Sequence, residues 1–178
     1  MMRKIIAGLF MSLDGVVEAP EKWHFPYLDE DVERSVFALL RRSEVMLLGR
    51  RTYEEFAPHW PQQDPDDPLA ALMNGRAKYV VSSTLTDPAW QNTTVITLDQ
   101  VAALKEEPGG DIGMSGSPSL VEALLREGLL DELHLLMDPV IIGTGRRLFE
   151  KGLGHIPLTL ARSATSGTGV LDLTYTRA

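Results

Sequence analysis

Short apolar runs alternate with helical periodicity along the first two thirds of the chain. Continuous apolar residues at 5–11 and 45–48 are typical of strands that are covered on both faces. Between them, apolar residues recur every three or four positions from Val32 to Leu40, which predicts a helix over 29–42. This alternation of strand and helix favours an α/β domain with a parallel sheet.

Further elements follow from the same rules. We expect a short helix at 50–56, an exposed acidic, proline-rich loop at 58–68, strands at 77–82 and 93–97, a helix at 100–106, a strand from 112, a helix from 117 to 128, and strands at 132–142, 158–164 and 170–176. Small polar residues at 166–169 predict a hairpin turn between the last two strands. The chain is therefore expected to form one domain over residues 1–178, with a mixed, mostly parallel sheet and antiparallel C-terminal strands.

Composition limits the classes of function. With 178 residues and 44% apolar content, the chain is long enough for one domain with a substantial core. A formal net charge of −8 argues against nucleic-acid and membrane-surface binding, which favour a basic face. The chain has no cysteine, and its four histidines show no metal-ligand spacing, so we expect no disulfide, no metal site and a cytoplasmic location. No apolar run approaches the ~20 residues that span a bilayer.

Three predicted strands end in glycine, hydroxyl or arginine residues. These segments lie at 49–52, 82–84 and 115–117. Glycine allows backbone N–H groups to approach a phosphate, and the N-terminus of a following helix adds unpaired donors and partial positive charge. Each segment by itself also fits an ordinary turn or helix cap. Three of them in one domain favour a ligand with several phosphates, such as a dinucleotide.

Two carboxylates and one basic segment are further candidates. Asp14 follows the first predicted strand, either as a turn residue or as part of a ligand site at the carboxyl edge of the sheet. Glu33 lies in the first predicted helix and is either solvated or directed at a ligand groove. The Gly-Thr-Gly-Arg-Arg run at 143–147 is either a glycine turn or a second basic loop near a phosphorylated substrate.

In this order and spacing, the segments resemble the dihydrofolate reductase superfamily. The closer resemblance is to the reductase domain of the bifunctional riboflavin-biosynthesis deaminase-reductase. It is carried by the residues at 12–15, 48–53, 81–83, 115–117, 128–133 and 139–145, and it covers nearly the whole chain. The resemblance implies a three-layer α/β fold with a central mixed sheet, helices on both faces, NADPH across the strand ends, and a homodimer.

The resemblance also implies roles for individual residues. The cofactor-binding set that it implies is Gly15, Gly49, Arg50, Thr52, Ser82, Ser83, Ser115, Gly116 and Ser117. In this set, the residues at 49–52 would hold the pyrophosphate, those at 82–83 the adenosine 2′-phosphate, and those at 115–117 the centre of the cofactor. Asp14 and Glu33 are the catalytic candidates, which would orient the substrate or pass a proton.

The implied function is an NADPH-dependent reductase that transfers hydride to a pyrimidine- or pteridine-type substrate. A ribosylaminopyrimidine phosphate, as in riboflavin biosynthesis, is the first candidate, and a pterin or dihydrofolate is the second. A protein that binds NADP(H) without turnover is an alternative of another class.

The chain departs from related patterns in three ways. The glycine pair of dihydrofolate reductases is replaced here by Ser115 and Gly116. The Gly-x-Gly-x-x-Gly fingerprint of Rossmann domains does not occur, so the cofactor would be held in another layout. A chain without cysteine cannot supply the Pro-Cys-x-x-Cys element of a zinc deaminase, so we expect only the reductase half.

Overall fold

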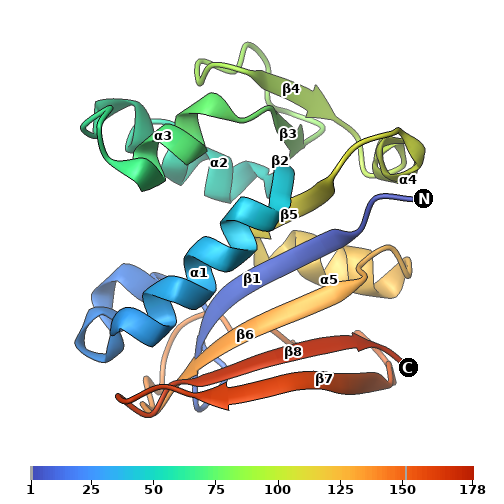
Figure 1. The fold of residues 1–178 in the computed structure, drawn as a ribbon. Helices are drawn as coiled ribbons and strands as arrows, with labels where there is room; N and C mark the ends of the chain where they lie inside the picture. Colours follow the sequence, from blue (N-terminus) through green and yellow to red (C-terminus); the bar gives the residue numbers. More distant parts are fainter. Residues whose placement is uncertain (1, 151) are drawn as a thin grey trace.

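The computed structural model describes residues 2–150 and 152–178 (Figure 1). Its strands are β1 (Ile5–Ser12), β2 (Ser43–Gly49), β3 (Lys78–Val81), β4 (Thr93–Ile96), β5 (Asp111–Ser115), β6 (Glu132–Asp138), β7 (Leu158–Thr165) and β8 (Leu171–Arg177). Its α-helices are α1 (Glu30–Arg42), α2 (Arg50–Phe56), α3 (Pro68–Gly75), α4 (Gln100–Glu106) and α5 (Pro118–Arg126). Short 3-10 turns lie at Pro20–Lys22, Phe25–Tyr27 and Trp60–Gln62.

The described strands form one eight-stranded sheet in the order β4-β3-β2-β5-β1-β6-β8-β7. Neighbours from β4 to β6 are parallel, whereas β8 is antiparallel to both β6 and β7. This order confirms the predicted mixed, mostly parallel sheet with antiparallel C-terminal strands. Because parallel strands end at the same edge, the carboxyl ends of β1, β2, β3 and β5 lie together, where α/β sheets bind ligands.

Helices cover both faces of the sheet, as predicted (Figure 1). The residues of β2 contact helices on both faces, because successive residues of a strand point to opposite faces of the sheet. Val45 and Leu47 pack into the cluster that contains α4 and α5, whereas Met46 and Leu48 pack with residues of α2 and α3. None of the helices in the described parts of the chain has the length and apolar character of a membrane span.

Helix α1 begins at a capped N-terminus and crosses the sheet close to its backbone. The Asp29 carboxylate accepts a hydrogen bond from the Val32 N–H at 3.0 Å, and acidic residues fill the first turn, which favours helix initiation here. A Cβ atom at Gly8 of β1 would collide with the Leu39 side chain, so glycine permits this close crossing. Val32 packs against Leu136 of β6 on the same face.

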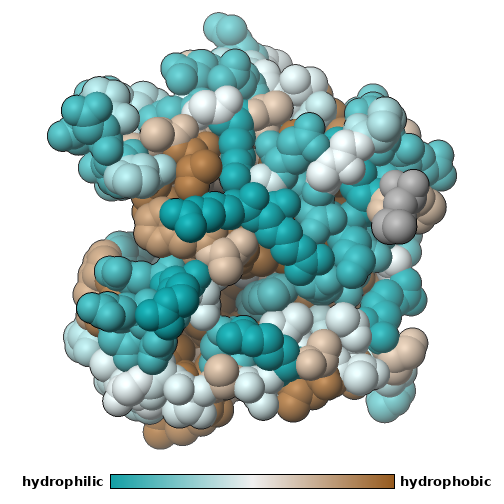
Figure 2. Space-filling model, viewed as in Figure 1, coloured by the Kyte–Doolittle hydropathy of each residue, from teal (hydrophilic) through white to brown (hydrophobic). Residues whose placement is uncertain are grey.

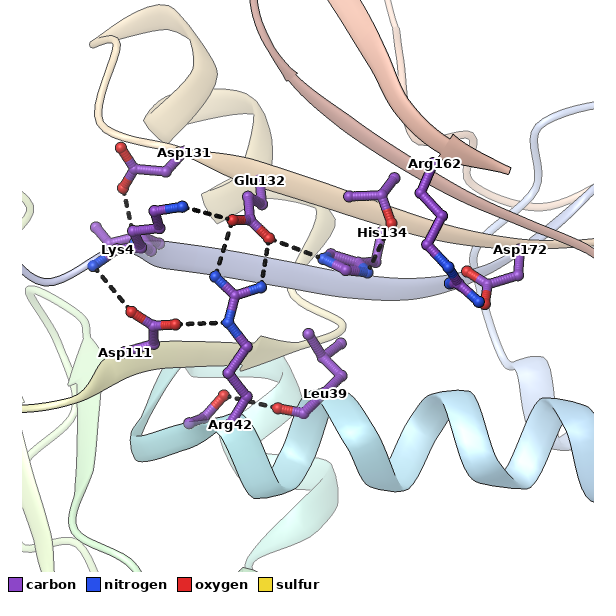
Figure 3. Close-up of polar contacts among 12 residues, drawn as sticks. Lys4, Leu39, Arg42, Asp111, Asp131, Glu132, His134, Arg162 and Asp172 are labelled. Atoms are coloured by element: carbon purple, nitrogen blue, oxygen red, sulfur yellow. Dashed lines mark hydrogen bonds and ion pairs between the residues drawn. The ribbon is translucent and has the colours of Figure 1, made fainter. Parts of the chain in front are cut away.

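A network of ion pairs holds the C-terminal end of α1 to the sheet (Figure 3). Arg42 Nη1 and Nη2 lie 2.7 and 2.8 Å from the two carboxylate oxygens of Glu132, and Arg42 Nε lies 2.7 Å from Asp111 Oδ2. Lys4 Nζ donates to Glu132 at 3.0 Å, and His134 Nε2 lies 3.2 Å from the same carboxylate. The hydrogen bonds from Arg42 are the largest cause that lowers the pKa of Glu132 to about 2, so the carboxylate is ionised at neutral pH.

The largest differences from the prediction are the end of β6 and the presence of α3. β6 ends at Asp138 rather than at 142, because Pro139 has no N–H to donate to a neighbouring strand. The proline-rich loop is followed by α3, a helix that the sequence pattern does not predict. Pro68 opens this helix, and the Asp67 carboxylate caps the Leu69 N–H at 2.9 Å. The capping signal was therefore present in the sequence but was assigned to the loop.

Candidate functional site

Two of the predicted phosphate-binding segments are in direct contact. The Gly49 N–H, at the end of β2, donates to Ser117 Oγ at 2.9 Å, and the Ser117 N–H, after β5, donates to Thr52 Oγ1 at 3.0 Å. Gly116 has a φ of +69°, and a Cβ there would lie 3.5 Å from the Thr52 side chain. Ser115 is the last residue of β5 and pairs with Gly8 of β1. The ends of β2 and β5 therefore meet beside the middle of β1, which continues for four residues to Ser12.

The third segment is joined to this edge by Arg50. Arg50 Nη1 donates to Thr84 Oγ1 at 2.9 Å, and Arg50 Nε lies 3.6 Å from Glu54 Oε1 in the next turn of α2. The Ser82 hydroxyl accepts hydrogen bonds from the N–H groups of Thr84 and Leu85 at 3.2 and 2.9 Å, which is the ordinary turn that the sequence allowed. These contacts use the Ser82 oxygen as an acceptor and leave its O–H able to donate.

Ser83, which follows Ser82 in this segment, has an exposed side chain. Thr84 belongs to the predicted segment at 82–84, although the cofactor-binding set implied by the resemblance does not include it. Its hydroxyl contacts Arg50, which joins this segment to α2.

Asp14 anchors the loop that follows β6. Its carboxylate accepts hydrogen bonds from the Ser12 hydroxyl at 2.7 Å and from the N–H groups of Ile142 and Gly143 at 3.1 and 2.8 Å. The hydrogen bond from Ser12 is the largest cause that lowers the pKa of Asp14 to about 2. An aspartate that is ionised at neutral pH can orient a group but is a poor proton donor, so this geometry favours the orienting part of its predicted role. Gly15, with φ of +86°, makes the adjoining turn.

The Gly-Thr-Gly-Arg-Arg segment is the turn that the sequence allowed, and its role near a phosphorylated substrate stays a prediction. It is a turn, since Gly143 and Gly145 have positive φ angles of 79° and 109°. The turn carries Arg146 Nη1 to within 2.7 Å of Ser119 Oγ in the first turn of α5, and Arg147 Nε donates to the Asp14 carbonyl at 2.9 Å. Arg146 is thus a basic residue of the carboxyl edge that was left outside the predicted cofactor set.

Glu33 is exposed on α1, four residues before Phe37 on the same side of the helix. Leu40, one further turn along this side, packs with the cluster that contains α2 and α3. Figure 2 shows a notch at the left edge of the molecule, between the upper part with α2 and α3 and the lower part with the start of α1, with apolar atoms on its upper wall. Glu33 therefore lies on the side of α1 nearer to α2, and its role towards a substrate stays a prediction.

A cavity of about 470 Å³ lies apart from this edge, between α1 and strands β6, β7 and β8. Its charged lining residues form ion pairs at 2.7 Å, which are Arg34 with Asp31, Arg42 with Glu132, and Arg162 with Asp172. The Ser35 hydroxyl also donates to Asp172 at 2.7 Å. None of the predicted site residues lines this cavity. The candidate site is therefore placed at the carboxyl edge, where the sequence segments meet.

Residues 3–171 match the RibD C-terminal domain family. The uncharacterized protein YyaP of Bacillus subtilis is 31% identical over 179 residues, which cover 97% of this chain and 94% of YyaP.

Three solved structures share the fold. A putative riboflavin biosynthesis protein from Shewanella sp. PV-4 has a TM-score of 0.79 at 19% identity, over 100% of this chain and 99% of that one. Dihydrofolate reductase from Enterococcus faecalis, in complex with NADP(H), has a TM-score of 0.65 at 16% identity, over 99% of both chains. The bifunctional deaminase/reductase of Thermotoga maritima has a TM-score of 0.69 at 12% identity, over 99% of this chain and 57% of that one.

The sheet order and its covering helices thus define a dihydrofolate reductase-like α/β fold. Within this class, the chain belongs to the RibD C-terminal domain family, which confirms the resemblance noted in the sequence.

Proposed function

We propose that this chain is an NADPH-dependent reductase of a pyrimidine- or pteridine-type heterocycle. The observation that carries the proposal is the junction of the three strand ends through the Gly49–Ser117, Ser117–Thr52 and Arg50–Thr84 hydrogen bonds. Membership of the RibD C-terminal domain family supports a reductase. The dihydrofolate reductase of the same fold binds NADP(H), which supports this cofactor here.

The residues at this edge fit a cofactor with several phosphates. Gly116 has the left-handed backbone that favours glycine, and it adds no side chain beside Thr52. The Arg50 side chain is 47% exposed and would give a pyrophosphate a charge-assisted hydrogen bond. Ser82 and Ser83 would donate to the 2′-phosphate that distinguishes NADPH from NADH. NADPH bound here supplies a hydride, and the chain supplies orientation and a dry pocket.

Two classes of substrate fit different parts of the site. Arg146 and Arg147, both close to the end of β1, favour a ribosylaminopyrimidine that carries a phosphate. Glu33 favours a pterin or dihydrofolate, whose amino groups a carboxylate would bind. Asp14, as an ionised carboxylate next to Gly15, would orient either substrate without giving up a proton.

The test is NADPH oxidation with a ribosylaminopyrimidine phosphate and with dihydrofolate as separate substrates. Turnover of the first supports a riboflavin-type reductase, and turnover of the second supports a folate-type reductase. Binding of NADPH without either turnover would support the alternative of another class, a protein that binds NADP(H) without reducing a substrate. Failure to bind NADPH would contradict the proposal.

A homodimer is part of the proposal. β7 forms one end of the sheet order, and its residues from Thr159 to Thr165 are exposed. Leu160 and Leu171, on neighbouring strands, are 50% and 39% exposed. An exposed edge strand with apolar residues favours pairing with another chain. Light scattering should give twice the chain mass of 19.7 kDa, and a Leu160→Lys change should shift the protein towards the monomer.

A further inference from the structure

A buried histidine of the loop that follows β1 pairs with a buried aspartate at the end of β6. His24, in the loop at 15–28, is 4% exposed, and Asp138, the last residue of β6, is 0% exposed. His24 Nδ1 lies 2.7 Å from Asp138 Oδ2, and the imidazole stacks on the Phe10 ring with centroids 3.7 Å apart. Because an ionised carboxylate only accepts hydrogen bonds, Nδ1 carries the proton in this pair.

Each member of the pair keeps one buried polar atom without a partner. These atoms are His24 Nε2 and Asp138 Oδ1, neither of which has a hydrogen bond from the described residues. Leaving a buried donor or acceptor unsatisfied costs roughly 1–3 kcal/mol, so such atoms are uncommon and often belong to a functional site. An aspartate that only anchored the loop would have both oxygens satisfied in the ordinary case. The pair therefore has capacity for a further polar group.

The pair lies next to the candidate site. β1 and β6 are paired so that Ser12 is directly opposite Asp138. The Ser12 hydroxyl in turn binds Asp14, so the pair adjoins the Ser-Leu-Asp-Gly segment at the carboxyl edge. Phe10 and Ser12 share the α1 face of β1, because they are two residues apart on a strand. This is the edge at which the proposed reductase would hold its substrate.

Reduction of a C=N or C=O bond requires a proton as well as a hydride. Asp14 is tied to three donors and stays ionised at neutral pH, so another group must give that proton. Histidine is the side chain that ordinarily ionises nearest neutral pH. A carboxylate on Nδ1 fixes the ring orientation and stabilises the imidazolium, which leaves Nε2 as the donor. The His24 ring stacks on Phe10 of β1 and is hydrogen-bonded to Asp138 of β6, which is the charged group of the two.

On the basis of the proposed reductase function, we propose that His24 is its proton donor and that Asp138 is the positioning residue. The carbon of the substrate C=N or C=O bond takes the hydride, and NADPH becomes NADP+. The π electrons of that bond become a lone pair on nitrogen or oxygen, and this atom takes the proton from His24 Nε2. The imidazole is left neutral and still hydrogen-bonded to Asp138. Because His24 is covered in the structure, the loop at 15–28 must admit the substrate to Nε2.

His24→Asn separates a chemical role from a structural one. The asparagine side chain retains an N–H that can reach Asp138, but it has no proton to give at the position of Nε2. His24→Phe retains a ring for stacking on Phe10 and loses both nitrogens. The exposed His155→Asn serves as the control. If the histidine only anchors the loop, His24→Asn should resemble wild type and His24→Phe should be impaired.

The proposal predicts that both His24 variants lose turnover. With the two substrates named above, kcat of His24→Asn should fall at least about 100-fold, the usual lower range for loss of a general acid. NADPH affinity should stay within about twofold of wild type. In wild type, kcat should fall as the pH rises, because the imidazolium is the donor form, and His24→Asn should lose this dependence.

Nitrogen-15 NMR of the histidine rings gives a readout that is independent of turnover. The His24 signals are assigned by their loss in His24→Asn. Asp138→Asn should change the Nδ1 chemical shift of His24, because a neutral amide replaces the carboxylate that accepts from Nδ1. An unchanged Nδ1 shift would overturn the role of Asp138.

The assays distinguish a wrong assignment of the proton donor from a wrong proposed function. If wild type binds and oxidises NADPH while His24→Asn keeps its kcat, the proton-donor role alone is wrong. If wild type does not bind NADPH, the proposed function is wrong and the proton-donor role falls with it. Binding of NADPH without reduction of either substrate also removes the donor role.

Discussion

Arg50 connects the ends of β2 and β3 through its hydrogen bond to Thr84, and half of its side chain is open to a ligand. Arg50→Ala removes the positive charge that would face the cofactor pyrophosphate. We expect NADPH binding to weaken by about 1.5 to 3 kcal/mol, the range for a charge-assisted hydrogen bond. Calorimetry measures this change, and Arg51→Ala, at the exposed neighbouring position, is the matched control. Equal affinity of Arg50→Ala and wild type would place Arg50 outside the cofactor site.

We expect Ser82 and Ser83 to decide the preference between the two nicotinamide cofactors. Their hydroxyl groups would donate to the 2′-phosphate, which NADH lacks, so the double change to alanine should weaken NADPH binding and leave NADH binding nearly unchanged. Dissociation constants for both cofactors give the ratio. Ser163→Ala, at an exposed position on β7, is the control. An undiminished NADPH preference in the double variant would refute this assignment.

At the scale of elements, the loop at 139–147 depends on Asp14. In the wild type, the two carboxylate oxygens of Asp14 accept from the N–H groups of Ile142 and Gly143. Asp14→Asn replaces one of these oxygens with an NH2 group, which cannot accept a hydrogen bond. Hydrogen exchange should therefore speed up at residues 142–143, whereas Asp31→Asn, on the exposed part of α1, should leave it unchanged. The pKa of Asp14 is lowered to about 2 from 3.8, so wild-type protection should persist at pH 4 and be lost as the pH falls towards 2. Loss of protection near pH 4 would show that the carboxylate is not held in this way.

The ion pairs at the end of α1 predict a pH dependence of stability. The pKa of Glu132 is about 2 in the folded chain, against 4.5 for an ordinary glutamate. A lowered folded pKa adds stability that is complete above the unfolded value and is lost between about pH 5 and pH 2. A shift of this size corresponds to on the order of 3 kcal/mol.

Urea unfolding of wild type and Glu132→Gln tests this contribution. The difference in unfolding free energy should be largest at pH 7 and should shrink by pH 3. The exposed Glu127→Gln is the control. A difference that is the same at both pH values would contradict the ion-pair account, because it would then reflect packing and not charge.

The sequence predicted those elements whose apolar pattern is strong, such as β1, β2 and α1, since burial requires that pattern. It extended β6 into 139–142 because these residues remain apolar, while Pro139 ends the pairing. α3 was missed because its cap lies within a stretch dominated by proline and aspartate. For β6, the local sequence therefore predicted the type of element correctly and its last residue incorrectly.

At the scale of the whole molecule, the site is built from contacts between residues far apart in the chain. Gly49 binds Ser117 across 68 positions, and Asp14 binds Gly143 across 129. The sequence suggested that strand-end segments would converge, since parallel strands share one carboxyl edge. It did not indicate that Arg146 would reach Ser119, or that His24 would pair with Asp138, because neither contact follows a local pattern.

We expect the carboxyl edge of this sheet to bind a 2′-phosphorylated nicotinamide cofactor. Titration of the wild-type protein with NADPH and with NADH, followed by nicotinamide fluorescence, tests this expectation. We predict saturable binding of NADPH that is at least tenfold tighter than that of NADH, equal to about 1.4 kcal/mol. Equal affinity for the two cofactors, or no binding of either, would contradict the account.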